Sequence, residues 1–440
     1  MIGRVLAWGG ATLVAGALGF AILAWRPAIA PAAVPDRASF PAEEVRRGAV
    51  LASAGFCATC HTRDGGGYNG GGKPVATPFG TIYGSNITPD PETGIGAWTR
   101  AAFDRSMRDG VSRDGRHLYP AFPYTHFVGL TEADLGALYA FTMTRDPVRA
   151  ETPAPELPFP LTVRPLLAGW KLLFGRSPAG RSPAPSADPA RGEAWNRGRY
   201  LAEALAHCGA CHTPRNVLGA EIASRVYEGG EADDWWSPPL HPSSPAPLAW
   251  SEESLFNYLR SWDERHGGGE GPMKPVVAGL SRLPEADLRA LAIYTKSLYG
   301  PERASDPPRS QAILARSGPV RRSAAVDRGE LVYRGACANC HESGAAVPFT
   351  VRSLGQHTSV AGPDPRNLLH AVLNGLHPVD GAVGAIMPAF RDVLSEGELV
   401  DLLAYSRARF TDEPDWPDAA AQVRRLSARG GSASPKGGTP

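Results

Sequence analysis

The six cysteines of this chain fall in three copies of one short motif, and no cysteine lies outside them. In each copy two cysteines separated by two residues are followed at once by a histidine. The copies are Cys57, Cys60 and His61; Cys208, Cys211 and His212; Cys337, Cys340 and His341. This is the attachment signature of c-type haem, in which both thiols form thioethers to the porphyrin and the histidine binds the iron. One copy would also suit a redox dithiol or half a zinc site, but zinc needs paired motifs and three copies cannot pair evenly. The sequence therefore predicts three covalently bound c-type haems, each with its iron.

Haem iron that transfers electrons usually has a sixth ligand, and methionine is the common one in cytochromes c. Met273 lies 61 residues after His212, and Met387 lies 46 residues after His341. Both methionines stand just before the last expected helix of their copy. We expect them to be the sixth ligands of the second and third irons.

The first copy breaks this pattern, because the residue 61 positions after His61 is Phe122. A phenylalanine ring cannot bind iron. His126 is our first choice as the substitute ligand, and bis-histidine iron would have a lower potential than iron with methionine. The alternatives, in order, are an open site, His117 and Met107.

A longer repeat surrounds each motif and indicates the elements that position it. Each motif follows an arginine–glycine pair and precedes an amphipathic helix. The pairs are Arg47–Gly48, Arg197–Gly198 and Arg328–Gly329, and the helices are expected at 130–141, 283–294 and 394–405. Thr131 and Ser395 are suited to cap the first and third of these helices, because each has an acid three residues later. Pro284 suits the first turn of the second. Shorter helices are expected between motif and final helix, at 96–110, 248–262 and 364–376.

The fold class we expect is mostly α, with three tandem class I-like cytochrome c domains after an N-terminal transmembrane helix. The expected segments are an anchor or signal at 1–30, domains at 40–150, 191–300 and 327–411, linkers at 151–190 and 301–326, and a disordered tail at 412–440. The first linker is rich in proline and serine, which favours an extended tether. Its apolar stretch 166–175 is suited either to pack against the first domain or to contact a membrane or a partner. The glycine-rich stretch 65–73 lacks the features of a phosphate loop and is interpreted as a flexible loop over the first haem.

An uncharged run of 21 residues extends from Val5 to Trp25. As a helix it would be about 30 Å long, enough to cross a bilayer. A cleaved signal peptide with its site at 28–30 is the alternative, but the run exceeds a normal signal core and Pro31 would follow the cut. The predicted location is the cytoplasmic membrane, with the haem domains on the periplasmic face. Basic and acidic residues nearly balance, 45 against 44, so no nucleic-acid partner is expected.

Most of the chain after the anchor resembles the three-haem cytochrome c subunit of bacterial membrane-bound dehydrogenases, which serves alcohol and gluconate dehydrogenases. The resemblance is carried by "TPFGTIYGSNITPDPETGIGAWTRAAF" (77–103), "DGRHLYPAFPY" (114–124), "ELPFPLTVRPL" (156–166), "HCGACHTPRN" (207–216) and "MPAF" (387–390). It implies that the chain takes electrons from a dehydrogenase catalytic subunit and delivers them to ubiquinone or a terminal oxidase at the membrane, with no catalytic residues of its own.

Phe122 departs from this family, in which a methionine is usual at that position. "YPAFPYTHF" (119–127) together with "RPLLAGWKLLF" (164–174) is more similar to relatives that accompany molybdenum hydroxylases, such as nicotinate or isoquinoline dehydrogenases. Two other functions compete with electron transfer. A peroxidase-like enzyme would use an open first site, and a purely structural anchor would have no need of three haem motifs.

Overall fold

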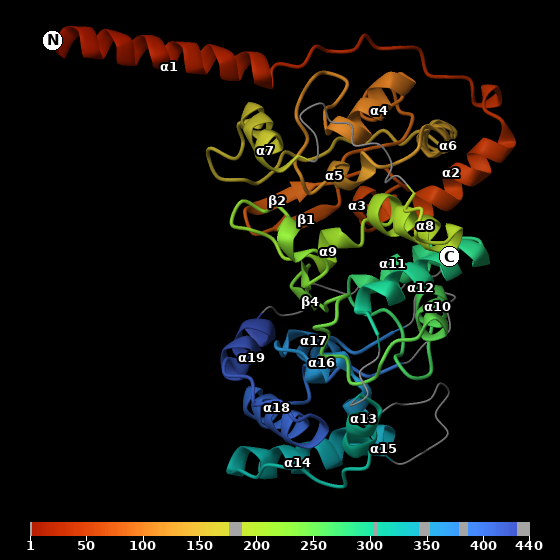
Figure 1. The fold of residues 1–440 in the computed structure, drawn as a ribbon, viewed down its shortest axis with the longest axis vertical. Coiled ribbons are helices and arrows are strands. Elements are labelled where there is room, and N and C mark those ends of the chain that lie inside the picture. Colours follow the sequence, from red (N-terminus) through yellow and green to blue (C-terminus); the bar gives the residue numbers. More distant parts are fainter. Residues whose placement is uncertain (1, 176–186, 302–305, 343–352, 378–385, 429–440) are drawn as a thin grey trace. The chain divides into compact units, whose positions relative to one another are not determined.

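The computed structural model describes residues 2–175, 187–301, 306–342, 353–377 and 386–428 (Figure 1). The chain divides into two compact units, Met1–His207 with Asn216–Ala220, and Cys208–Arg215 with Glu221–Pro440. Helices dominate both units, and the strands of the described residues form only two antiparallel hairpins. The expectation of a mostly α fold is confirmed. The division into three tandem domains stays a prediction.

The first unit contains one hairpin and the first eight helices. In chain order its elements are α1 (Ile2–Ala24), α2 (Ala42–Ala54), α3 (Cys57–His61), β1 (Pro74–Thr77), β2 (Gly80–Tyr83), α4 (Arg100–Asp109), α5 (Tyr124–Phe127), α6 (Glu132–Met143), α7 (Leu167–Phe174) and α8 (Glu193–Tyr200). A π-helical turn at Leu201–Leu205 continues α8, and short 3-10 turns lie at Arg37–Ser39 and Arg164–Leu166.

The second unit contains the other hairpin and the remaining helices. Its elements are α9 (Gly209–His212), β3 (Gly230–Ala232), β4 (Trp235–Ser237), α10 (Glu252–Arg260), α11 (Met273–Leu280), α12 (Glu285–Tyr299), α13 (Asp306–Leu314), α14 (Ala324–Ala336), α15 (Ala338–His341), α16 (Thr358–Ala361), α17 (Arg366–Asn374), α18 (Glu396–Phe410) and α19 (Ala419–Ala428). Two 3-10 turns lie at Ala223–Arg225 and Leu354–Gln356. Figure 1 shows α18 lying between α14 and α19.

The final helix of each copy begins at the capping residue that the sequence indicates. The Thr131 hydroxyl accepts a hydrogen bond from the Asp134 backbone N–H at the start of α6. Ser395 and Glu398 form a complete capping box at the start of α18. Pro284 stands at the cap position of α12 rather than inside its first turn. The three predicted middle helices are α4, α10 and α17. Local sequence signals therefore predict these helices correctly to within a few residues.

Helices α2 and α6 cross closely in the first unit, and a glycine makes this crossing possible. A Cβ atom added to Gly48 would lie 1.9 Å from the carbonyl oxygen of Ala137 and 2.7 Å from the Cβ atom of Phe141. A side chain of any size would clash at these distances. The glycine of the first arginine–glycine pair thus lets the two backbones touch.

Helices α14 and α18 repeat this contact in the second unit. A Cβ atom added to Gly329 would lie 2.0 Å from the carbonyl oxygen of Asp401 and 2.8 Å from the Cβ atom of Tyr405. Asp401 occupies the position of Ala137 in the repeated helix, and Tyr405 that of Phe141. The same atoms meet in the first and third copies, so for these two the sequence repeat is also a structural repeat in which the first and last helices cross.

The arginine beside each of these glycines reaches across to the final helix. Arg47 Nη2 lies 2.6 Å from Asp134 Oδ1, and the Tyr200 hydroxyl donates to the other carboxylate oxygen of Asp134. Arg328 holds Asp401 through two parallel bonds, at 2.7 and 2.8 Å. Asp134 is almost completely buried, whereas the side chain of Arg47 is half-exposed. Asp134 therefore depends on Arg47 to compensate its buried charge, whereas the guanidinium of Arg47 can also be solvated by water.

Replacing Arg47 by alanine is expected to lower the free energy of unfolding of the first unit by about 3 kcal/mol, because it leaves a buried carboxylate without its charged partner. Asp134→Asn is expected to cost less, about 1–2 kcal/mol, since water can reach the guanidinium that it leaves behind. Urea unfolding of the two variants measures both values. A larger loss for Asp134→Asn would contradict this interpretation.

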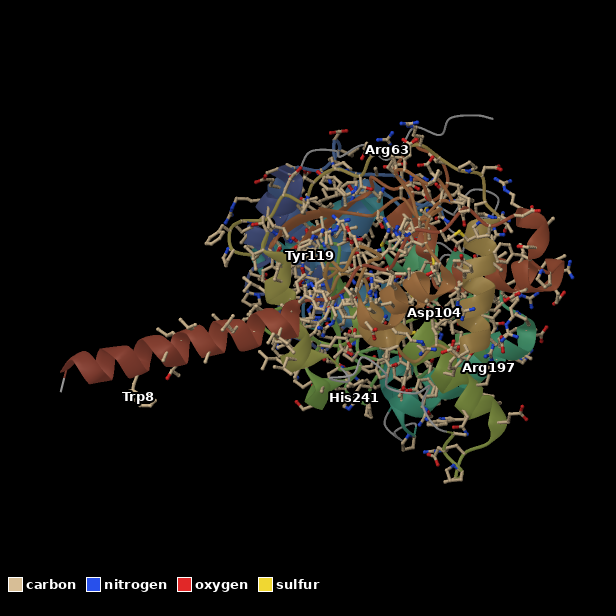
Figure 2. The ribbon with its side chains drawn as sticks, turned by 90° about the horizontal axis from the view of Figure 1, so that it is seen from above. Trp8, Arg63, Asp104, Tyr119, Arg197 and His241 are labelled. Atoms are coloured by element: carbon tan, nitrogen blue, oxygen red, sulfur yellow. The ribbon has the colours of Figure 1, made fainter. Side chains whose placement is uncertain are left out.

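The predicted N-terminal membrane anchor is wrong. Crossing a bilayer takes about 20 predominantly apolar residues in succession. Among the residues that the structure describes, none of the helices combines the length and the apolar character that a membrane span requires. α1 covers the predicted run except for its last residue, Trp25, and Figure 2 shows the Trp8 side chain of α1 pointing outwards. At the other end of α1, the carbonyl oxygen of Ala24 lies 2.9 Å from Nε2 of the buried His117.

The predicted disorder of the segment 412–440 is also wrong for the part that the structure describes. α19 packs against α17 and α18 and buries Val423 and Leu426. Trp416, just before α19, is 5% exposed, and its indole N–H donates to the carbonyl oxygen of Gly362. The expectation of disorder rested on the glycine- and serine-rich end of the segment, whereas the residues before it pack three apolar side chains on the core and hold an ion pair between Arg425 and Asp234. Residues 429–440 lie outside the described residues.

The segments predicted as extended linkers each contain a helix, α7 in the first and α13 in the second. α7 packs against the remainder of the first unit. This agrees with one of the two interpretations of the stretch 166–175, packing against the first domain. The Lys171 ammonium group donates to the carbonyl oxygens of Asp109 and Gly110, at 2.7 Å each. Leu172 and Leu173 are exposed on the other side of α7.

Candidate haem-attachment sites

Each of the three motifs forms a single helical turn, in α3, α9 and α15. Two cysteines three positions apart lie on the same side of a helical turn, and the histidine follows directly. In the first two motifs, the residue before the first cysteine has a left-handed backbone, with φ of 38° at Phe56 and 37° at His207. The rings of these two residues pack edge to face, with 4.6 Å between the ring centroids. The first and second motifs thus share an entry turn as well as a pattern of residue types.

The histidines of the first two motifs are oriented by the same kind of hydrogen bond. Nδ1 of His61 lies 2.6 Å from the carbonyl oxygen of Ser85, and Nδ1 of His212 lies 2.7 Å from that of Pro238. A carbonyl accepts only from N–H, so the proton is on Nδ1 and the lone pair is on Nε2. This is the arrangement in which metal-binding histidines are usually held. Burial lowers the pKa of both rings, which favours the neutral form that binds metal.

Each of these carbonyl groups directly follows a β-hairpin that packs against its motif through glycines. The Gly71 N–H donates to the carbonyl oxygen of His61 at 2.7 Å, and the Gly229 N–H donates to that of His212 at 2.9 Å. Gly84 and Gly230 approach the motifs still more closely. An added Cβ would lie 1.7 Å from the carbonyl oxygen of Cys60 in the first case and 2.3 Å from that of Cys211 in the second.

The glycine-rich stretch 65–73 is tied to the first motif, contrary to its interpretation as a flexible loop. Asn69 is 2% exposed, and its backbone N–H donates to the hydroxyl of Thr62. Added Cβ atoms on Gly67 and Gly70 would lie within 3 Å of the Val148 side chain. Glycines here allow close approach to neighbouring side chains and backbone rather than mobility.

The first cysteine of the first and third motifs does not resemble the reactive thiol of a redox-active dithiol. Burial raises the pKa of Cys57 to about 12 and that of Cys337 to about 11, whereas reactive thiols have a lowered pKa. Within the described ranges, no three or more His, Cys, Asp and Glu side chains converge as a metal site would require. Covalent attachment of haem needs neither feature.

The two candidate methionine ligands lie where the sequence indicates, next to the last helix of their copies. Met273 is the first residue of α11 and is half-buried. Met387 forms an antiparallel bridge with Leu376, through two N–H···O bonds of 2.9 Å, and packs against the core of the second unit. His341 lies near the ring of His357, with 6.4 Å between the ring centroids. Residues 343–352 and 378–385, on either side of this region, are outside the described residues.

Phe122, which stands at the sequence position of the missing methionine, belongs to a cluster of aromatic side chains. Phe122 packs against Phe127 and Tyr124, with ring centroids 5.5 and 6.5 Å away. His126 follows in α5 and is 4% exposed. Its Nδ1 lies 2.8 Å from the carbonyl oxygen of Glu203, so this ring is held in the same way as those of His61 and His212.

The other two candidates are held in different ways. Nε2 of His117 lies 2.9 Å from the carbonyl oxygen of Ala24, and its Nδ1 lies 3.1 Å from Nζ of Lys171, so both ring nitrogens have partners. Met107 lies in α4 and is 7% exposed. Both His117 and His126 are thus buried and hydrogen-bonded to a backbone carbonyl, and the choice of a sixth ligand stays a prediction.

Two profiles of haem protein families match the chain. The cytochrome c family matches residues 45–146, and the family of cytochrome c oxidase, cbb3-type, subunit III matches residues 324–405. A nicotinate dehydrogenase subunit of Pseudomonas putida is 45% identical over 417 residues, which cover 93% of this chain and 34% of that protein. The gluconate 2-dehydrogenase cytochrome c subunit of Pantoea cypripedii is 37% identical over 82% of this chain and 85% of its own length. The fructose dehydrogenase cytochrome subunit of Gluconobacter japonicus is 34% identical over 81% and 76%.

The chain belongs to the family of dehydrogenase cytochrome c subunits. The expected family resemblance is therefore confirmed. This dehydrogenase cytochrome c subunit is an electron-transfer protein of the cytochrome c type, whose domains carry covalently bound c-type haem. It spans about a third of the length of the nicotinate dehydrogenase subunit, and most of the length of the gluconate and fructose dehydrogenase subunits.

The residues of this dehydrogenase cytochrome c subunit fit the group that the family implies. In the first two motifs, the thiols lie on one helical turn and the next residue is a histidine whose Nδ1–H is bound to a carbonyl. Sequence reasoning missed the residues that provide this support, namely Ser85, Pro238 and the glycines of the hairpins. The distances along the chain from motif to support differ between copies, so no fixed spacing could have revealed them.

A buried lysine beside His117 makes stability depend on pH. Burial lowers the pKa of Lys171 from 10.5 to about 7. Between these values the unfolded chain binds more protons than the folded chain, so the free energy of unfolding rises with pH from about 7 upwards. Lys171→Met is expected to flatten this rise. Urea unfolding at pH 7, 8 and 9 measures it, and parallel curves for the two proteins would contradict the prediction.

Proposed function

We propose that this dehydrogenase cytochrome c subunit holds three c-type haems and passes electrons from a dehydrogenase catalytic subunit to ubiquinone or a terminal oxidase. When bound, c-type haem supplies one-electron transfer at its iron. The cysteines of the three motifs hold the porphyrin through thioethers. His61, His212 and His341 would each provide one ligand to the iron of their haem, and the sulfurs of Met273 and Met387 would provide a further ligand to the second and third irons.

The observation that carries this proposal is the shared support of the first two motif histidines. Two motifs 151 residues apart in the sequence place Nδ1 against a backbone carbonyl, at 2.6 and 2.7 Å. A histidine that served only to pack would not need the same tautomer in both copies. Fixing the proton on Nδ1 leaves the Nε2 lone pair for iron.

The partner that we propose is a catalytic subunit of the molybdenum-hydroxylase class. The 45% identity to the nicotinate dehydrogenase subunit supports this choice, as does the occurrence of Phe122 in the stretch 119–127. The dehydrogenase complex would oxidise a small organic substrate, and this chain would provide no catalytic residue. Copurification of the chain from its native host identifies the partner, and a quinoprotein partner in its place would refute the proposed class.

Mass spectrometry of the mature protein tests the haem assignment. Three covalent haem adducts are expected, one on each pair of cysteines. In a second measurement, the copurified dehydrogenase with its substrate should reduce all three haems, so that their absorption spectra change from ferric to ferrous. Unmodified thiols at any of the three motifs would refute the proposal for that site. Replacing both cysteines of one motif by alanine is expected to remove one adduct and leave two.

For the first iron we propose His126 as the sixth ligand. Its Nδ1 is bound to the carbonyl oxygen of Glu203 at 2.8 Å, and its ring is buried. The tautomer is therefore the same as that of His61 and His212. Bis-histidine coordination would give this haem the lowest potential of the three, because methionine raises the potential of the other two.

Paired substitutions test this ligand. His126→Ala is expected to convert one of three low-spin haems to high spin, as seen by electron paramagnetic resonance. His117→Ala is the matched control, since His117 is a buried histidine of the same unit that is also bound to a backbone carbonyl, and it should leave all three haems low-spin. An unchanged spectrum in His126→Ala would remove His126 as a ligand.

A haem enzyme with an open coordination position is the competing function, and Phe122 is the observation that favours it. The native protein distinguishes the two. Three low-spin ferric haems that are insensitive to cyanide agree with electron transfer alone. A high-spin signal that shifts with cyanide would instead support a peroxidase-like activity at the first site.

A further inference from the structure

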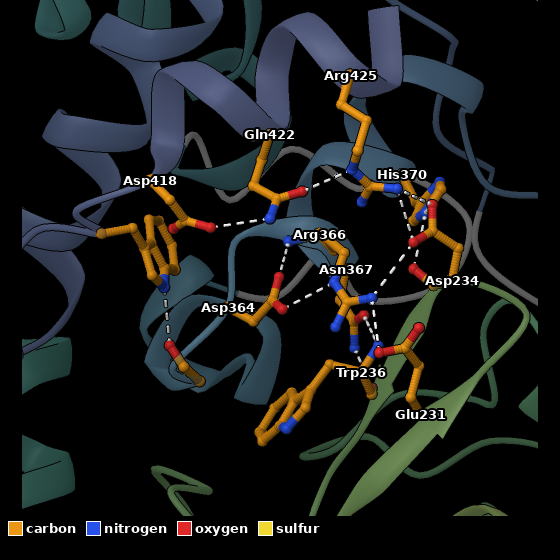
Figure 3. Close-up of polar contacts among 12 residues, drawn as sticks. Glu231, Asp234, Trp236, Asp364, Arg366, Asn367, His370, Asp418, Gln422 and Arg425 are labelled. Atoms are coloured by element: carbon orange, nitrogen blue, oxygen red, sulfur yellow. Dashed lines mark hydrogen bonds and ion pairs between the residues drawn. The ribbon is translucent and has the colours of Figure 1, made fainter. Parts of the chain in front are cut away.

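Two carboxylates, Asp234 and Glu231, join the hairpin of the second motif to the helices of the third copy (Figure 3); Glu231 pairs with Arg366 at 3.0 Å, and Asp234 makes the larger number of contacts. Asp233 and Asp234 form the two-residue turn between β3 and β4, both with positive φ, as a tight hairpin of this type requires. The Asp234 carboxylate accepts two bonds from Arg425 in α19, at 2.8 and 2.9 Å, and one from Arg366 in α17 at 3.3 Å. Its carbonyl oxygen lies 3.2 Å from Nε2 of His370.

The two residues after Asp234 are bound by the same helix. The Trp235 ring stacks on His370, with 4.7 Å between the ring centroids. The Trp236 backbone exchanges two hydrogen bonds with the Asn367 side chain, which accepts from the N–H at 2.9 Å and donates to the carbonyl oxygen at 2.8 Å. Three consecutive residues of the hairpin are thus held by α17, and the side chains involved are largely buried.

This hairpin leads directly to the support of His212. Pro238 follows β4, and its carbonyl oxygen is the one that holds Nδ1 of His212 at 2.7 Å. On the other side of the hairpin, Gly230 touches the backbone of Cys211. A displacement of the hairpin would therefore change the hydrogen bond to the histidine of the second motif.

The opposite end of α17 leads to Met387. The helix ends at Gly375, where φ is 71° and an added Cβ would lie 2.5 Å from the carbonyl oxygen of Met387. Leu376 then forms the bridge with Met387 through two bonds of 2.9 Å. One short helix, α17, thus contacts both the hairpin of the second motif and the segment that contains Met387.

We propose that Asp234 is a positioning residue that fixes the His212 support against the helix that holds Met387, so that the environments of the second and third irons are set together. This inference rests on the proposed function. The imidazole hydrogen bond sets how basic the ligand is, and a more basic ligand stabilises ferric iron. Loosening the hairpin weakens that bond and raises the potential of the second haem. Methionine coordination favours ferrous iron and so raises the potential. Loosening α17 lengthens the methionine contact and therefore lowers the potential of the third haem.

Asp234→Asn is the decisive variant, because asparagine tolerates the left-handed backbone and only the charge is lost. Spectroelectrochemical titration of the full-length haem protein measures the three midpoint potentials, assigned beforehand with Met273→Ala and Met387→Ala. We expect the second potential to rise, the third to fall and the first to stay unchanged. Glu228→Gln is the matched control, since Glu228 precedes the same hairpin and its carboxylate pairs with the exposed Arg225, and it should shift none of the three.

Potentials that stay unchanged in Asp234→Asn, or a shift at only one of the two haems, would overturn the inference even if the variant is less stable. If Asp234→Asn does not fold, Arg425→Gln leaves the Arg366 contact in place and must give the same two directions with smaller amplitude. The haem content of every preparation is measured in parallel. Three haems with unshifted potentials refute the coupling alone, whereas missing haems in the parent protein refute the proposed function.

Discussion

Alanine in place of Gly329 is expected to destabilise the second unit by about 3 kcal/mol, the upper range for an overpacked contact. The added methyl group would overlap the carbonyl oxygen of Asp401 at 2.0 Å, and backbone atoms cannot rotate aside. α14 and α18 must then separate. Separation also disturbs the two bonds between Arg328 and Asp401 and the packing of Tyr405, which is completely buried.

Gly335, in the same helix, provides the matched control. It is exposed, and an added Cβ would meet no atom within 4 Å. Gly335→Ala is expected to stabilise the protein by up to about 1 kcal/mol, because alanine has the higher helix propensity. Urea unfolding of both variants compares them. Equal effects of the two substitutions would show that helix propensity, and not the crossing, determines the result at position 329.

Replacing Trp416 by alanine is expected to lower the free energy of unfolding of the second unit by about 3–5 kcal/mol, as for other large buried aromatic residues. The indole donates to the carbonyl oxygen of Gly362, and the Arg407 guanidinium lies 4.4 Å from the ring centroid. Its loss leaves a cavity and removes one of the two hydrogen bonds that the Gly362 carbonyl accepts, the other coming from Arg407. α19, which buries Val423 and Leu426 next to it, is expected to detach at lower urea concentrations than the remainder of the unit.

Hydrogen exchange of α19 and equilibrium unfolding measure these two effects. Arg424→Ala serves as the control, because Arg424 is an exposed residue of the same helix, and a change within about 0.5 kcal/mol is expected. Trp416→Ala with unchanged stability would mean that the segment after Thr411 is only loosely attached, as the composition of the sequence had suggested.

Local patterns in the sequence predict the helices and the candidate ligands of this chain well. Thr131 and Ser395 cap the helices that they were expected to cap, and the middle helices lie within the predicted ranges. These signals act over a few residues and depend little on the remainder of the fold. The N-terminal run and the tail were misjudged because length and composition report what a segment could do alone, not what packs against it.

The sequence by itself determined that three pairs of cysteines each precede a histidine, that the helices recur in the same order around them, and that a methionine is missing from the first copy. Only the tertiary structure decided which backbone carbonyls orient His61, His212 and His126, and why glycine stands at 48 and 329. The physical reason is that carbonyl oxygens and close backbone contacts carry no residue-type signal. Any residue provides a carbonyl, and its position follows from packing between segments distant in the chain.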